Sequence, residues 1–195
     1  MAKKKLAPAD ILPPAEYAVR RKEERRRMVA LKSRRRVEVG PFATFYFESY
    51  DTMWHQVHEM LHIEKGGAEQ VPGELAAYNP LIPQGRELVA TLMVEIDDPA
   101  RRQRELARLG GIERSAFIEL DGQRIAGAAE EDAERTTPEG KASSVQFVRF
   151  RLTPEQAARF KAAGTRVLLG LDHANYGHIA VLPEEVRAEL AKDLD

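Results

Sequence analysis

The sequence contains no cysteine, which removes several classes of chemistry at once. A chain without thiols has no disulfide, no cysteine-ligated zinc or iron–sulfur cluster and no thiol nucleophile. Any bound metal ion would need histidine, aspartate or glutamate ligands. Long apolar runs are also missing, and prolines interrupt the start of the chain where a signal peptide is apolar. We therefore expect no membrane partner and a cytoplasmic location.

The composition is otherwise that of an ordinary globular protein. The 195 residues are 43% hydrophobic and 31% charged, which is enough apolar material for one sizeable core. The net charge of -1 gives no overall nucleic-acid signature, so nucleic acid is not an expected partner. Basic side chains nevertheless concentrate in residues 20–36, where ten are basic and two are acidic.

Proline and periodicity divide the chain into elements. Residues 1–14 read as an extended N-terminal arm, because Pro13 and Pro14 stop helix formation before them. Residues 15–195 read as a single domain. We expect the Asp121–Gly122 pair to form a tight hairpin turn, which places Glu119 opposite Arg124.

The order of elements predicts the fold class. Helices are expected at 15–31, at 53–65 with Asp51 or Thr52 as the cap, near 74–78, after Asp98, after Thr153 and after Pro183. Strands are expected at 37–39, 42–48, 88–96, 145–152, 165–171 and 179–182, with a turn at 172–177 between the last two, and residues 117–125 are expected to form the hairpin. This order is not a βαβ alternation. It predicts an α+β domain with an antiparallel or mixed sheet and helices packed on it.

One motif carries a specific chemical expectation. His58, Glu59 and His62 form an H-E-x-x-H sequence on a predicted helix. Both imidazoles could bind one zinc or iron ion, and the glutamate could deprotonate a metal-bound water. Lys65 and Ala68 stand where a metzincin has its glycine and third histidine. A metal-dependent hydrolase at His58 and His62 is one alternative function.

The pattern of the same helix argues against that alternative. Its apolar residues cluster on one side, and His55, His58 and His62 lie on another. If the helix has a single buried face, these histidines point mainly to solvent.

Polar residues also occur inside apolar strands, among them Glu48, Glu95 and Arg149. A charged group on a buried strand face needs a partner or a ligand. Arg35 or Arg36 is predicted to pair with Glu48 or Glu95 across the sheet, so that losing either arginine lowers the melting temperature.

Several stretches resemble domain-of-unknown-function family 3501, a bacterial family without an agreed activity. The most specific are residues 78–83 (YNPLIP) and 143–150 (SSVQFVRF), and the resemblance covers nearly the whole chain. The family usually has glutamine and arginine at the positions of His58 and His62. Its genes often neighbour those of rubrerythrin and of an iron–sulfur oxidoreductase, which implies a role in oxidative stress and those two proteins as partners.

Three functions follow as hypotheses. The first is an accessory or small-ligand-binding protein of a redox-stress system, the second is the metal-dependent hydrolase, and the third is an interaction protein that binds an acidic partner through its basic N-terminal helix. For the first, polar residues that match the family pattern supply the ligand-binding set: Glu48, Gln56, Glu59, Asn79, Glu95, Arg149 and His173.

Overall fold

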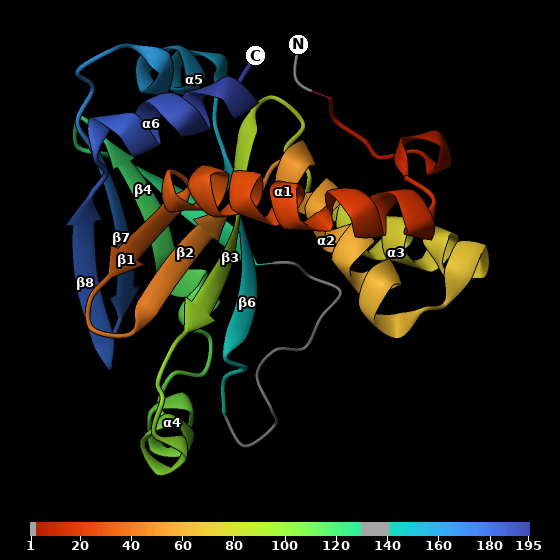
Figure 1. Ribbon diagram of the computed structural model, residues 1–195. Helices are drawn as coiled ribbons and strands as arrows, with labels where there is room; N and C mark the ends of the chain where they lie inside the picture. Colours follow the sequence, from red (N-terminus) through yellow and green to blue (C-terminus); the bar gives the residue numbers. More distant parts are fainter. Residues whose placement is uncertain (1–2, 130–140) are drawn as a thin grey trace.

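An eight-stranded antiparallel sheet forms the centre of the computed structural model, which describes residues 3–129 and 141–195 (Figure 1). The spatial order of its strands is β1-β2-β3-β6-β5-β4-β7-β8, and every pairing is antiparallel. The strands are β1 (Arg36–Val39), β2 (Ala43–Phe47), β3 (Glu87–Val94), β4 (Ala116–Leu120), β5 (Gln123–Ala129), β6 (Val145–Arg151), β7 (Val167–His173) and β8 (Tyr176–Val181). The predicted α+β class is confirmed.

The sheet coils until its two edge strands meet. The Tyr176 hydroxyl of β8 donates to the Val39 carbonyl of β1 at 2.8 Å and accepts from the amides of Phe42 and Ala43, both at 3.1 Å. One phenol thus serves three backbone groups of the β1–β2 turn. The contact covers backbone that an open edge would expose to water.

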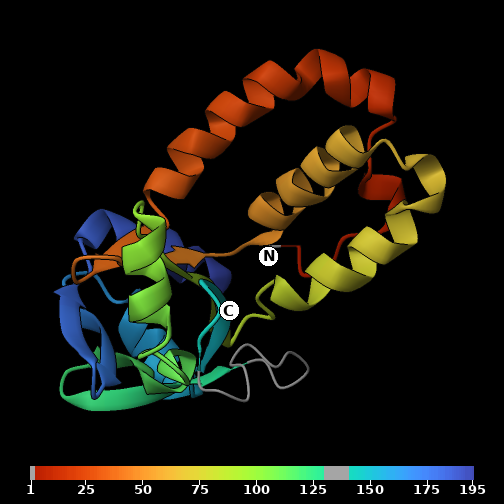
Figure 2. The same ribbon diagram turned by 90° about the horizontal axis from the view of Figure 1, so that it is seen from below.

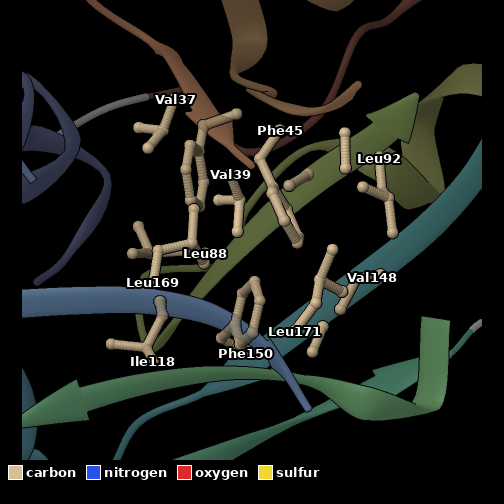
Figure 3. Close-up of a cluster of buried hydrophobic side chains, with 14 of the residues drawn as sticks. Val37, Val39, Phe45, Leu88, Leu92, Ile118, Val148, Phe150, Leu169 and Leu171 are labelled. Carbon is tan, nitrogen blue, oxygen red and sulfur yellow. The ribbon is translucent and has the colours of Figure 1, made fainter. Parts of the chain in front are cut away.

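The main core fills the inside of this coiled sheet (Figure 3). Alternate strand residues point inward, so Leu88, Ala90 and Leu92 of β3 meet Val148 and Phe150 of β6. Helices α5 (Pro154–Lys161) and α6 (Glu184–Leu190) lie together near the C-terminus, and α4 (Pro99–Leu106) lies at the other end of the sheet (Figure 1).

Three further helices form a lobe on the outer face of the sheet (Figure 2). They are α1 (Pro14–Ser33), α2 (Tyr50–Glu64) and α3 (Val71–Tyr78). A second apolar cluster joins Val57 and Leu61 of α2 to Leu75 of α3, and joins both helices to Val89 of β3 and Phe147 of β6. We call α1, α2, α3 and the N-terminal arm the helical lobe.

The N-terminal arm is tied firmly into this lobe. It contains one turn of 3-10 helix at Pro8–Asp10. Leu6 is 1% exposed, and its amide and carbonyl both bond the Asn79 side chain, at 2.7 and 3.0 Å. The Trp54 indole donates to the Asp10 carbonyl at 2.9 Å.

Most predicted elements are present, with two local differences. Helix α2 begins at Tyr50, and Ser49 rather than Asp51 or Thr52 is its cap, accepting a hydrogen bond from the Thr52 amide at 3.3 Å. The turn predicted at 172–177 is shorter, because strand pairing runs on to His173 and Tyr176. The Asp121–Gly122 hairpin has the predicted register.

Arg35 is the most deeply buried cation of the basic segment, with 2% of its surface exposed. Its guanidinium donates to the carbonyls of Phe47 and Glu48 at 3.0 and 2.9 Å. Its carboxylate partners are Asp193 and, at 3.7 Å, Glu189, and not the predicted Glu48 or Glu95 side chain. The prediction missed Asp193 because this partner follows Arg35 by more than 150 positions in the sequence.

Every helix within residues 3–129 and 141–195 is too short or too polar to cross a bilayer.

Candidate functional site

A cavity of about 320 Å³ lies inside the helical lobe, between the N-terminal arm, the start of α1, the end of α2 and the start of α3. Most of its lining is apolar. The apolar wall includes Ile11 and Leu12 of the arm, Leu61 of α2 and Val71 of α3. Three polar rings also line it, those of Tyr17, His58 and His62.

The histidines reach this cavity because α2 is covered on two sides. Val57 and Leu61 face α3 and the sheet, whereas His55 and His58 face α1 and the arm. His58 is 1% exposed and His55 is 9% exposed. The expectation that these two histidines point to solvent is therefore wrong, because the helix has two buried faces rather than one.

His58 uses both of its ring nitrogens within the protein. Nδ1 donates to the Trp54 carbonyl at 2.7 Å, and Nε2 accepts from the Leu12 amide at 2.9 Å. This pattern requires the neutral imidazole with its proton on Nδ1. Burial lowers the pKa of His58, which also favours the neutral form. Neither nitrogen is free to bind a metal ion.

Glu59 is held in the same way. Arg21 donates two hydrogen bonds to its carboxylate, both at 2.8 Å, and the Tyr17 hydroxyl donates a third at 2.7 Å. The Arg21 guanidinium lowers the pKa of Glu59 to about 2. Such a carboxylate is a poor base for a metal-bound water. The described part of the chain contains no group of three or more histidine or acidic side chains that could hold a metal ion.

The groups around the cavity share unusual electrostatics. Burial raises the pKa of Tyr17 above its ordinary value, with Glu59 adding to the effect. Burial also lowers the pKa of His55. Shifted pKa values beside an apolar cavity are typical of functional sites, although internal ion-pair networks produce them as well.

His62 is the polar group that the cavity offers to a ligand. Its ring is half-buried, lies 6.2 Å from the Tyr17 ring and has no hydrogen-bond partner within residues 3–129 and 141–195. A ligand in the cavity would therefore meet an apolar wall and one unpaired imidazole. Neutral imidazole both donates and accepts, so His62 suits an alcohol, an amide or a carboxylate.

The predicted ligand-binding residues do not share this cavity. Glu48, Gln56 and Arg149 lie on or above the outer face of β3 and β6. The Glu48 carboxylate is buried and accepts from the hydroxyls of Thr52 and Thr91, both at 2.6 Å. Gln56 approaches the Tyr78 hydroxyl at 3.5 Å, and Arg149 pairs with Glu87.

The remaining members of that set are dispersed. Glu95 accepts from the Tyr46 hydroxyl at 2.9 Å on the surface, and Asn79 holds the backbone of Leu6. His173 lies in the β7–β8 hairpin and contacts the Gly110 carbonyl at 3.2 Å, away from the helical lobe. Only Glu59 borders the cavity network, through its bond to Tyr17.

Sequence reasoning missed the residues of α1 that complete the network. Tyr17 and Arg21 are four positions apart, which places both side chains on one face of a helix. An aromatic residue and an arginine on one face of an otherwise polar helix are a detectable signal. What they contact on α2 does not follow from that signal.

The comparisons with known proteins agree with this description of the fold. The chain is similar to a novel protein of unknown function from Burkholderia pseudomallei K96243 whose crystal structure is known. The identity is 39%, the TM-score is 0.91, and the match covers 98% of this chain and 100% of that one. No curated protein matches. The model of a family described as protein of unknown function (DUF3501) matches residues 5–194, and the chain belongs to that family.

Proposed function

We propose that the protein binds a small, largely apolar molecule in the cavity of the helical lobe. The observation that carries this proposal is the cavity itself, about 320 Å³ of mostly apolar space with the unpaired His62 ring on its wall. Ligand sites in proteins commonly combine such a wall with a few polar groups. The ligand fits as a compact aromatic or aliphatic body that carries one polar group for His62.

The internal bonds around the cavity support a preformed site. Tyr17 is fixed by Glu59, and the His58 ring packs against both Tyr17 and Trp54, with ring centroids 4.7 and 3.9 Å away. Rings held in this way lose little freedom when a ligand arrives. The neutral state of His58 also keeps a charge out of the apolar wall.

The single tryptophan provides the assay. Trp54 contacts the His58 ring beside the cavity, so its fluorescence should respond to an occupant. Benzoate, benzyl alcohol and octanoate are suitable probes of shape and charge. We expect at least one to change Trp54 emission and to raise the melting temperature, because a ligand at 100 times its Kd adds about 2.7 kcal/mol of stability.

Two matched variants test the location. Val71→Phe places a ring at the cavity wall, whereas Val181→Phe adds the same ring on exposed β8. Binding should be lost in the first variant and kept in the second, and His62→Ala should weaken every probe that binds, because each carries its one polar group for His62. The proposal fails if none of the three probes binds, or if both phenylalanine variants behave alike.

The wider role that we propose is that of an accessory protein in a redox-stress system. Its support is family membership together with the gene neighbours that the family implies, a rubrerythrin and an iron–sulfur oxidoreductase. Affinity purification from a bacterium that encodes all three proteins tests it. Recovery of neither partner, under conditions that retain other known complexes, would remove this part of the proposal.

A further inference from the structure

Helix α1 is unusually open for a helix of 20 residues. Only Tyr17 and Met28 are buried in it. Figure 2 shows α1 as the outermost helix of the lobe, with α2 and α3 on one side of it. Most side chains of α1 are therefore exposed to solvent.

Two valines stand out on its exposed side. Val19 is 85% exposed and Val29 is 72% exposed, the two highest values among the exposed large hydrophobic residues. Lys22 and Arg26 lie between them at spacings of three, four and three residues, which places all four side chains along one stripe. The valines are about 15 Å apart along the helix axis, at 1.5 Å per residue. We call these four residues the α1 stripe.

The charges of the stripe are not used inside the protein. Arg20, Arg21 and Arg27 pair with Glu16, Glu59 and Glu24 respectively. In contrast, Lys22, Arg25 and Arg26 are exposed and form no ion pair within residues 3–129 and 141–195. The acidic side chains of the protein thus pair with the neighbouring arginines, and Lys22 and Arg26 can pair with acidic groups of another molecule.

We infer that the α1 stripe docks an acidic amphipathic helix of a partner protein. A helix matches the regular spacing of the stripe, with apolar side chains against Val19 and Val29. Carboxylates in its middle would meet Lys22 and Arg26. The apolar ends supply the buried area, and the charges select the partner and its orientation. Duplex DNA offers charge but nothing that fits two valines three turns apart.

Synthetic peptides test this directly. The probe is a helical peptide of about 18 residues, roughly five turns, with two leucines ten positions apart and glutamates between them. The control peptide has the same amino-acid composition in scrambled order. By fluorescence anisotropy, the protein should bind the ordered peptide more tightly than the scrambled one, and binding should weaken as salt rises.

Paired variants identify the surface. Lys22→Glu with Arg26→Glu should weaken binding by about tenfold or more, because like charges then face each other. Val19→Ser with Val29→Ser should reduce the ordered peptide to the affinity of the scrambled one. The control is Arg104→Glu with Arg166→Glu, two exposed arginines that form no ion pair in the described structure. Equal loss in this control, equal binding of both peptides, or stronger binding of a DNA duplex at the same salt would overturn the inference.

Discussion

Replacing Arg35 with alanine should destabilise the protein strongly. Arg35 and Asp193 have side chains that are only 2% and 9% exposed, so they form a buried ion pair. Removing one member of such a pair leaves the other charge without compensation, which costs about 3–5 kcal/mol. The carbonyls of Phe47 and Glu48 also lose their donors. For a chain of this length, the melting temperature should fall by roughly 10 °C.

The assay is urea unfolding followed by Trp54 fluorescence, with Arg36→Ala as the matched control. Arg36 pairs with Glu38 on the surface, and exposed pairs contribute about 0–1 kcal/mol. Burial raises the pKa of Asp193, and Arg35 opposes that shift. Without Arg35 the carboxyl should therefore take up a proton more easily, so Asp193→Asn should restore part of the lost stability in the double variant.

This reasoning is refuted if Arg35→Ala and Arg36→Ala lower the free energy of unfolding by similar amounts. It is also refuted if Asp193→Asn makes Arg35→Ala less stable still.

Three further predictions concern the network beside the cavity. Burial lowers the pKa of His58 and His55 in the folded state, so their contribution to stability should be complete above about pH 6.5 and lost as the pH falls through their lower folded pKa values. Melting curves recorded between about pH 8 and about pH 5 should show this loss of stability. The loss should be smaller in His58→Gln. Arg21 lowers the pKa of Glu59 to about 2, so Glu59 should stabilise the fold fully above its ordinary pKa of 4.5, and this stabilisation should disappear as the pH falls towards 2. In acid titrations, Glu59→Gln should abolish this loss of stability. Zinc or a chelator should leave the melting temperature of the protein unchanged, because both His58 nitrogens are already bonded; stoichiometric metal in elemental analysis would contradict this.

Local signals predicted the elements well. Pro14 marks the start of α1, and the Asp121–Gly122 turn sets the register that places Glu119 opposite Arg124. In both cases, residues adjacent in sequence determine the conformation. The alternating residues of β3 also predict its inward and outward faces, because a strand residue points to one side or the other.

The candidate site was harder to predict, because its parts come from distant segments. The pattern of apolar residues in α2, taken alone, predicts that His58 faces solvent. It is buried because Leu12 and Tyr17, more than 40 positions earlier, cover it. The H-E-x-x-H spacing gives the correct helix face for His58 and His62. It carries no information about the hydrogen bonds that occupy both His58 nitrogens.

Contacts of residues 193–195 with much earlier segments affect the order in which the protein folds during synthesis. The Asp195 amide donates to the Gly85 carbonyl at 2.8 Å, and its carboxylate pairs with Lys4 at 2.7 Å. Asp193 pairs with Arg35. A growing chain therefore carries Lys4 and Arg35 without these partners until residues 193–195 have been made. The junction between α1 and β1 should therefore become rigid late, after the strands that precede residues 193–195 have paired.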